Sequence, residues 1–152
     1  TRDGRHYLSN LPFELKQDNI LAVHATPSEP EKWGYILSLP QATLEFHALP
    51  DDVSVCFVGH THNPVIFRDH DGICSEVPGN QCQLNADCRY IVNVGSVGQP
   101  RDGDPRAAYC VYDSDNVQVE IKRIKYDVET AQQKIRSACL PDFLATRLAI
   151  GR

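Results

Sequence analysis

The sequence lacks several features that most proteins of its length have. Its 152 residues include no methionine and only one tryptophan. The chain opens with Thr1-Arg2-Asp3-Gly4, which is not a natural translation start. Together, the missing methionine and this opening indicate a fragment or a processed product of a longer protein.

An excess of positive charge and long apolar runs are also missing. Lys and Arg number 15 against 20 Asp and Glu, a net charge of −5, so no nucleic-acid-specific surface is expected. No apolar run approaches the roughly 20 residues of a membrane span, and no membrane partner is expected. The length and a hydrophobic content of 41% suit a single domain with a real core.

The six cysteines form no C-x-x-C pair. Three of them lie inside apolar runs and are predicted to be small buried hydrophobic residues: Cys56, Cys110 and Cys139. Cys82 and Cys88 flank a short loop, which allows either a disulfide or a metal clip. The default expectation is a reduced, cytoplasmic protein.

Two histidines follow a glycine at the end of a predicted strand. Residues 53–57 are apolar and β-branched, which is typical of a buried strand. Gly59 permits a bend, and His60 and His62 come next with one residue between them. In an extended segment residues two apart point the same way, so both imidazoles can serve one cluster or two adjacent metal ions. Imidazole suits Zn, Mn, Fe or Ni; the alternative is a pair of surface histidines in a turn.

A third histidine has the same setting. Residues 20–23 form a compact apolar run, predicted to be a buried strand, and His24 follows at its end. A loop with two prolines comes next, and Pro64 likewise follows the other two histidines. The alternative for His24 is a buried histidine with satisfied hydrogen bonds.

The remaining pattern predicts strands first and helices last. Further strands are expected at 13–16, 65–67, 73–77, 89–94, 107–112 and 117–124. Helical segments are expected at 33–37, at 41–49, after a capping Asp127, and in a short final helix closed by Gly151. Residues 1–11 show no clear period. The order predicts one domain of mixed α and β structure.

Residues 95–105 are predicted to form a long loop rich in glycine and proline. Such a loop can hold an anion through its backbone N–H groups and the guanidinium of Arg101. The alternative is an ordinary crossing between strands, and composition does not decide between the two.

Three motifs occur in order and at fitting spacings. They are His24 before its proline loop, Gly59-His60-Thr61-His62, and Asn93-Val94-Gly95-Ser96-Val97-Gly98-Gln99-Pro100-Arg101. Together they resemble the calcineurin-like metallophosphoesterase superfamily, most closely its small bacterial and archaeal phosphodiesterase branch, from about residue 8 onward. The resemblance implies an α/β (α+β) fold, a two-sheet β sandwich flanked by helices.

The resemblance also implies a site with two divalent metal ions, which could be Mn, Fe, Zn, Ni or Mg. His24 and His60 would ligate one ion and His62 the other. A hydroxide between the ions would hydrolyse a phosphomonoester or phosphodiester. Gly95, Ser96 and Arg101 would help hold the substrate phosphate. No residue is assigned as catalytic.

The motifs of that family that this sequence lacks are as informative as the motifs that it shares. Its first three motifs are absent: an Asp-x-His, a Gly-Asp and a Gly-Asn-His-Asp. In the family they precede the position of Thr1, so residues 1–152 are predicted to be the C-terminal part of one such domain, catalytically incomplete alone. Three imidazoles without a carboxylate are a poor site for two hard dications. The expected partners are a phosphoester substrate and either the missing N-terminal half or a second chain, with a homo-oligomer as a further option.

Two other functions are considered. A non-catalytic protein-interaction module on the same fold is the main alternative; three converging imidazoles favour the enzyme over it. An amidohydrolase with its own His-x-His motif needs a barrel of about 250 residues, which this chain is too short to form.

Overall fold

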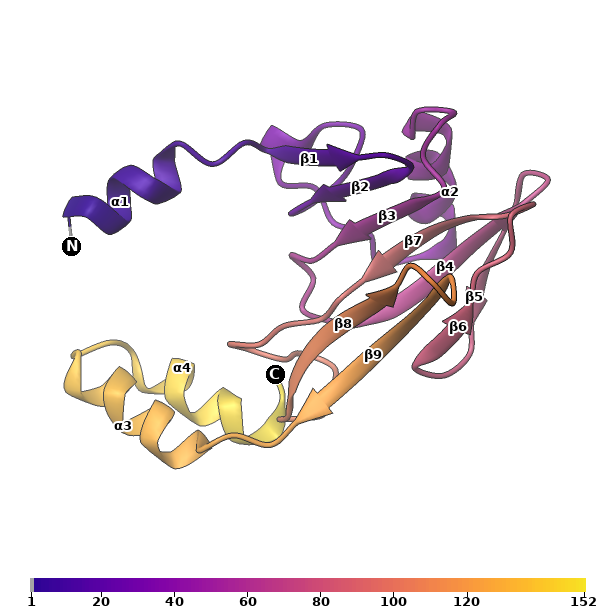
Figure 1. Cartoon of the computed structure of the whole chain (residues 1–152). Coiled ribbons are helices and arrows are strands. Elements are labelled where there is room, and N and C mark those ends of the chain that lie inside the picture. The colour runs from indigo at the N-terminus through magenta and orange to yellow at the C-terminus, as the bar shows by residue number, and fades with distance from the viewer. Residues whose placement is uncertain (1) are drawn as a thin grey trace.

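Two β-sheets form the centre of the protein, and helices lie at both ends of the chain (Figure 1). The computed structural model describes residues 2–152. The elements in order are α1 (Arg2–Ser9), β1 (Glu14–Gln17), β2 (Ile20–Val23), η1 (Pro30–Lys32), α2 (Leu39–Ala48), β3 (Val55–Val58), β4 (Val65–His70), β5 (Ile73–Val77), β6 (Gln81–Gln83), β7 (Arg89–Asn93), β8 (Ala107–Asp113), β9 (Gln118–Ile124), α3 (Val128–Ser137), α4 (Asp142–Thr146) and η2 (Arg147–Ile150).

The larger sheet brings three strand ends to one edge. Its order is β1-β2-β3-β7-β4-β5, and β2, β3 and β7 run parallel in its middle. The register pairs Ala22 with Phe57 and Val58 with Asn93. Because parallel strands end on the same side of a sheet, the segments that follow β2, β3 and β7 meet there.

Each face of this sheet has its own core. Along β3, Val55 faces the smaller sheet β6-β9-β8, while Cys56 faces α2. Along β7, Val92 and Ile91 alternate in the same way, and both are fully buried. Burial of each such aliphatic side chain contributes about 1.5–3 kcal/mol. The two-sheet sandwich with flanking helices is therefore confirmed.

Most predicted elements are confirmed, but three differ. Residues 2–9, where no period was found, form α1, and its Tyr7 and Leu8 stay 66% exposed, so the helix shows no burial pattern. Residues 33–37 form no helix because Trp33 has a left-handed φ of 56°. The short strand β6 was not predicted.

The C-terminal helices follow their predicted signals. The Asp127 carboxylate accepts a hydrogen bond from the Thr130 N–H at 2.9 Å and caps α3. Gly151 ends η2 at φ 64°, and a Cβ there would lie 2.7 Å from the backbone of Asp104. The last turn is thus seated on the loop before β8, and only glycine fits.

All six cysteines are free thiols, including Cys82 and Cys88, which are both buried. Cys56 is buried as predicted. The prediction for Cys139 is wrong, because this residue follows α3 on an exposed surface. In residues 2–152, no helix combines the length and the apolar character that crossing a membrane requires.

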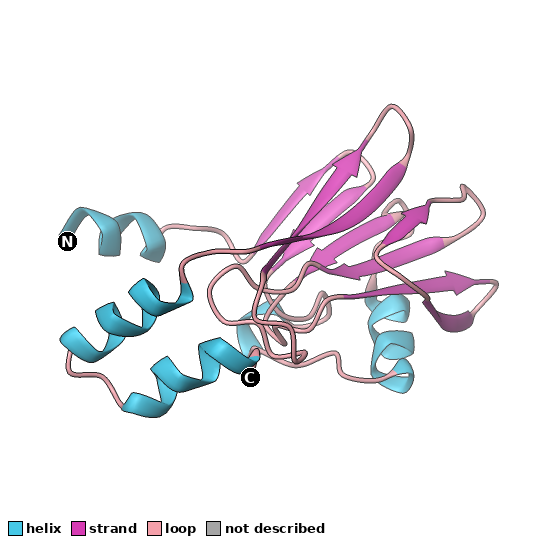
Figure 2. Ribbon diagram, turned by 90° about the horizontal axis from the view of Figure 1, so that it is seen from below, coloured by secondary structure: helices cyan, strands magenta, loops and turns pink. Residues whose placement is uncertain are grey.

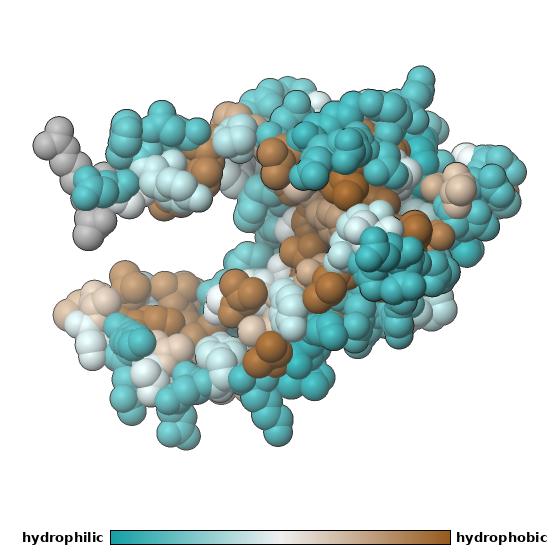
Figure 3. All heavy atoms as spheres, viewed as in Figure 1, coloured by the Kyte–Doolittle hydropathy of each residue, from teal (hydrophilic) through white to brown (hydrophobic). Residues whose placement is uncertain are grey.

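The terminal helices give the molecule an open outline. Figures 1 and 2 show α1 and the α3–α4 pair extending from the same end of the sheets. The space-filling view shows a hollow between these two arms, with apolar side chains along it (Figure 3). The strand ends that carry the histidines open toward this hollow.

Candidate functional site

The structure brings His24, His60 and His62 to one cavity; we call them the imidazole cluster. His24 Nε2 lies 3.2 Å from His60 Nδ1, and the two ring centroids are 5.1 Å apart. All three side chains line a cavity of about 400 Å³. Residues after β7 and on β8 complete its wall: Val94, Gly95, Ser96, Val97, Ala108, Tyr109 and Cys110.

The backbone that presents His60 and His62 is not extended as predicted. Both residues have left-handed backbone angles, with φ of 62° and 60°. Such angles are uncommon outside glycine, and cost of order 1–3 kcal/mol where the structure enforces them. Hydrogen bonds fix this turn: the Gly59 N–H donates to the His24 carbonyl at 3.0 Å, and the Arg101 N–H donates to the His62 carbonyl at 3.1 Å. The two imidazoles share the cavity because of this turn, not because of strand alternation.

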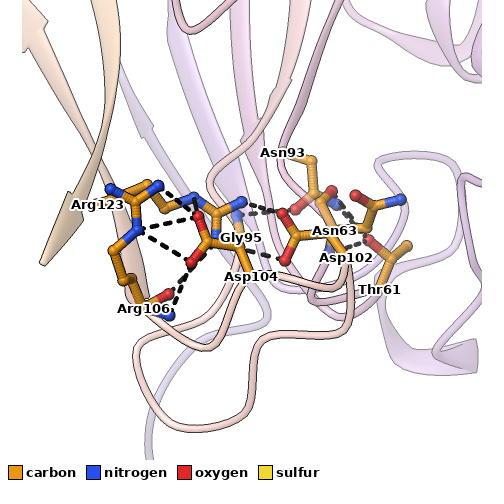
Figure 4. Close-up of polar contacts among 8 residues, drawn as sticks. All are labelled: Thr61, Asn63, Asn93, Gly95, Asp102, Asp104, Arg106 and Arg123. Carbon is orange, nitrogen blue, oxygen red and sulfur yellow. Dashed lines mark hydrogen bonds and ion pairs between the residues drawn. The ribbon is translucent and has the colours of Figure 1, made fainter. Parts of the chain in front are cut away.

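Asn93 joins the turn after β3 to the loop after β7. This fully buried side chain donates from Nδ2 to the Gly59 carbonyl at 2.8 Å. It also donates to Thr61 Oγ1 at 2.9 Å (Figure 4). Its Oδ1 accepts from the Gly95 N–H at 3.0 Å. The sequence placed Asn93 in a motif but gave it no role; its position as the last residue of a buried strand was the available signal.

The environment of His24 and His62 favours the neutral imidazole. His62 Nδ1 lies 2.6 Å from the Gln99 carbonyl oxygen, which can only accept, so Nδ1 carries the proton and Nε2 keeps its lone pair. Burial lowers the pKa of His62, and the Arg101 charge adds to this against the opposite effect of the Gln99 hydrogen bond. Burial and the two neighbouring imidazoles lower the pKa of His24. Neutral imidazole is the form that binds metal.

Two aromatic rings border the cluster. Tyr35 stacks on His60 with centroids 4.2 Å apart, and the Trp33 ring lies 5.3 Å from His24 and 5.8 Å from His60. Sequence reasoning assigned this segment to a helical turn and missed the contact. Its concentration of aromatic residues beside Gly34 was the only local signal.

Of the three predicted phosphate-binding residues, two line the cavity and the third lies outside it. Gly95 and Ser96 line the cavity, but the Gly95 N–H is already bonded to Asn93. Ser96 Oγ accepts from the Gln99 N–H at 3.0 Å. The Arg101 guanidinium is exposed and folds onto Gln99 Oε1 at 2.8 Å, outside the residues that line the cavity.

The donors present fit one part of a metal centre. Two nitrogens bound to one ion at roughly 2.0–2.1 Å lie roughly 3.0–3.4 Å apart in adjacent positions, and the His24–His60 separation of 3.2 Å falls in this range. However, residues 2–152 hold no group of three or more His, Cys, Asp or Glu placed to hold a metal. The residues described here therefore do not fit a complete dimetal centre, and no reaction step is assigned through one.

An ion-pair network anchors the loop that holds His62. Arg123 on β9 pairs with Asp102, and its Nη1 donates to the Arg106 carbonyl at 3.3 Å. Arg106 in turn binds Asp104 through its side chain (Figure 4). The same loop presents the Gln99 carbonyl to His62. By holding this loop in place, the network also holds the carbonyl that orients the His62 imidazole.

Replacing Arg123 with methionine should therefore loosen His62. Only 10% of the Arg123 side chain is exposed, so losing its partners should cost about 1–3 kcal/mol in the free energy of unfolding. Urea unfolding measures this cost, and ¹⁵N shifts of the His62 ring report whether Nδ1 keeps its proton. Lys122→Met is the matched control, since the Lys122–Glu120 pair is exposed. Equal effects of both variants would contradict the network's role.

Asp104 should make stability depend on pH. Hydrogen bonds from the Arg106 side chain, then from its backbone N–H, lower the pKa of Asp104 from 3.8 to about 2. A carboxylate whose pKa is depressed on folding stabilises the protein above its unfolded pKa and loses that contribution as pH falls toward the folded value. Asp104→Asn should thus be less stable than wild type at pH 5, with the difference shrinking toward pH 2 in urea unfolding. A difference between Asp104→Asn and wild type that stays constant from pH 5 to pH 2 would contradict this.

Known proteins share this architecture. The chain is 36% identical to a metallophosphoesterase from Sphaerobacter thermophilus, with a TM-score of 0.90 over 100% of this chain and 62% of that one. It is 34% identical to the uncharacterized protein MJ0912 of Methanocaldococcus jannaschii, over 96% of this chain and 59% of that protein. The hypothetical protein PH1004 of Pyrococcus horikoshii shares the fold at a TM-score of 0.74, 20% identity, and 99% and 55% coverage.

The chain thus spans about three fifths of the length of these relatives. Residues 2–117 match the family described as the calcineurin-like phosphoesterase superfamily domain, and this stretch contains all three histidines of the imidazole cluster. The matched stretch also covers the turn after β3 and the loop after β7. The chain belongs to the calcineurin-like phosphoesterase superfamily.

Proposed function

We propose that this chain carries the imidazole side of a metal-dependent phosphoesterase site that acts on phosphomonoesters or phosphodiesters. The observation that carries the proposal is the 3.2 Å approach of His24 Nε2 to His60 Nδ1 at the ends of two parallel strands. His24 and His60 would hold one divalent ion. His62, whose Nε2 hydrogen-bonds to no group in residues 2–152, would serve a second one.

The same proposal requires acidic ligands from outside these residues. Neutral imidazoles offer nothing to offset the charge of two dications, and hard ions prefer carboxylate oxygen. We propose that a further segment, either the N-terminal part of such a domain or a second chain, supplies them. Imidazole ligands favour Mn, Fe, Zn or Ni over Mg. We also propose a cytoplasmic location, because the cytoplasm keeps thiols reduced and all six cysteines are free thiols.

A second candidate function is a protein-interaction module on the same fold. The observation in its favour is the set of exposed large apolar side chains beside the cluster, among them Leu8, Phe13 and Trp33. The enzyme remains the first proposal, because an interaction surface has no need of three imidazoles around one cavity.

A chimera tests the enzyme. This chain would replace the matching part of the Sphaerobacter thermophilus metallophosphoesterase, and turnover of p-nitrophenyl phosphate and bis(p-nitrophenyl) phosphate would be measured with Mn²⁺. Turnover is expected, and His62→Ala should lower it by roughly 100-fold or more. His47→Ala, on the exposed side of α2, is the control. A folded chimera without turnover, or one that His62→Ala leaves unchanged, would overturn the proposal.

A further inference from the structure

A second cavity lies at the opposite end of the sheets from the imidazole cluster. Its lining includes Ser54 and Val55 at the start of β3, Tyr90 at the start of β7, and Val117 in the turn that joins β8 to β9. Figure 1 shows the starts of β3 and β7 on the side away from the terminal helices. The volume is about 320 Å³, which is within the range of small-molecule sites, roughly 300–1,000 Å³. We call it the distal cavity.

The lining of the distal cavity is apolar in one part, rich in amides in another, and includes no charged residue. Val55 and Leu84 are buried in its apolar part, and the Tyr112 ring stands beside them. Exposed carboxylates flank the lining residues in the sequence: Asp18, Asp87 and Asp113. Because negative charges repel an anion, this cavity suits an uncharged ligand and disfavours a phosphate.

Gln83 presents a hydrogen-bond acceptor whose orientation is fixed. Its Nε2 donates to the Asn116 carbonyl at 2.5 Å and to the Val117 carbonyl at 3.2 Å. Carbonyl oxygens can only accept, so the amide nitrogen must face them and Oε1 must lie on the other side of the amide group. Within residues 2–152, Oε1 has no hydrogen-bond partner, so it can accept from a ligand.

Asn85 presents a hydrogen-bond donor two residues further on. Its Oδ1 accepts from the Asp87 N–H at 3.1 Å, and its backbone N–H donates to the Tyr90 hydroxyl at 3.0 Å. These bonds fix the side-chain amide, and its Nδ2 donates to no group of the described chain. Residues two apart in an extended segment point the same way, while Leu84 between them is buried. An acceptor and a donor therefore lie on the same side of this segment.

The turn on the other side of the distal cavity is strained. Val117 has a left-handed φ of 49°, which is a genuine outlier for a β-branched residue. Its carbonyl accepts from the Leu84 N–H at 2.9 Å as well as from Gln83, so the turn is fastened to the segment after β6. Backbone strain of this kind clusters at ligand sites, where the surrounding structure enforces it.

We infer that the distal cavity binds a neutral nucleobase, as the free base or as a nucleoside. Each base carries a donor and an acceptor near one another on its edge, and this is the pair that Gln83 Oε1 and Asn85 Nδ2 complement. Its flat face suits the apolar wall, with the Tyr112 ring as the stacking partner. The site is separate from the imidazole cluster, and the inference does not rest on the phosphoesterase.

Titration with nucleosides tests the site. Adenosine, guanosine, cytidine and uridine would be added to the ¹⁵N-labelled chain of 152 residues, and the side-chain NH₂ signals recorded by NMR. We expect at least one of the four to bind saturably and to shift the NH₂ signals of Asn85 and Gln83. The 5′-monophosphate of that nucleoside should bind more weakly, because the lining offers no cation to the phosphate.

Two variants separate the donor from the charge. Asn85→Asp removes the Nδ2 donor but keeps the oxygen that accepts from the Asp87 N–H, so the turn is preserved. This variant should bind the nucleoside roughly tenfold more weakly. Ala86→Asp is the matched control, since it adds the same charge at the next, exposed lining position and leaves Asn85 intact. It should bind as wild type does.

Three results would overturn the inference. The first is the absence of saturable binding by all four nucleosides. The second is equal affinity of wild type and Asn85→Asp. The third is binding that shifts the indole N–H of Trp33, the single tryptophan, and not the two amides, since the nucleoside would then be stacked beside the imidazole cluster. The readout needs no turnover, so an inactive chimera would leave this inference standing.

Discussion

Replacing His60 with alanine should strongly weaken divalent-metal binding at the imidazole cluster. His24 Nε2 and His60 Nδ1, 3.2 Å apart, are placed like adjacent ligands of one ion. Without His60, His24 is the one imidazole left for this ion and holds it far more weakly, so affinity should fall by roughly 100-fold or more. Ni²⁺ is the suitable probe, since it binds imidazole strongly, and titration calorimetry measures the change.

The chain offers matched controls for this variant. His47 on α2 and His70 at the end of β4 are exposed and lie outside the cluster, so their alanine variants should bind Ni²⁺ as wild type does. Stability should change little with His60→Ala, because the half-buried ring loses mainly its stacking with Tyr35, about 1 kcal/mol. If His60→Ala binds Ni²⁺ like the two controls, the cluster is not a metal site.

Replacing Asn93 with alanine should destabilise the whole protein. The change leaves the part-buried Gly59 carbonyl and the buried Gly95 N–H without the partner that the fully buried Asn93 side chain supplies. Each unsatisfied buried group costs about 1–3 kcal/mol, so we expect a loss of about 3 kcal/mol or more in urea unfolding. Ni²⁺ affinity should fall as well, because the left-handed turn that carries His60 and His62 loses its hydrogen bonds to the Asn93 side chain.

Asn63→Ala provides the comparison. This neighbouring asparagine is exposed, and its link to Thr61 Oγ1 uses the backbone N–H, which alanine keeps. Its variant should lie within about 0.5 kcal/mol of wild type. Similar values for the two asparagine variants would show that Asn93 does not hold the site together.

The strands that carry the site could be predicted from the sequence for a clear physical reason. β2, β3 and β7 lie in the middle of the larger sheet. β3 and β7 contribute to the cores on both faces, while β2 is buried on one face and half-buried on the other, so each strand reads as a short continuous apolar run. A histidine that closely follows such a run must lie where the C-terminal ends of these parallel strands meet. The predicted meeting of His24 with His60 depends only on this.

The local geometry of the site could not be predicted, because distant residues impose it. The left-handed angles of His60 and His62 depend on Asn93, more than 30 residues away, and on the loop that carries Gln99. The aromatic wall of Trp33 and Tyr35 replaces a predicted helical turn for the same reason: its conformation is set by packing against the cluster. No local pattern encodes such contacts.

The role of Arg101 shows a different limit. Composition left open whether its loop binds an anion or is an ordinary crossing between strands. In the structure the guanidinium folds onto Gln99, while the loop's backbone supports His62. The loop acts here through its carbonyl groups and its anchor at Arg123. Side-chain chemistry in the sequence says little about which backbone group will face a site.

Anomalous diffraction from crystals of this chain grown with Ni²⁺ tests the central claim most directly. We predict a strong anomalous peak at the imidazole cluster, within bonding distance of both His24 Nε2 and His60 Nδ1, about 2.1 Å from each. No peak there, or peaks only at exposed histidines such as His47 and His70, would contradict the account.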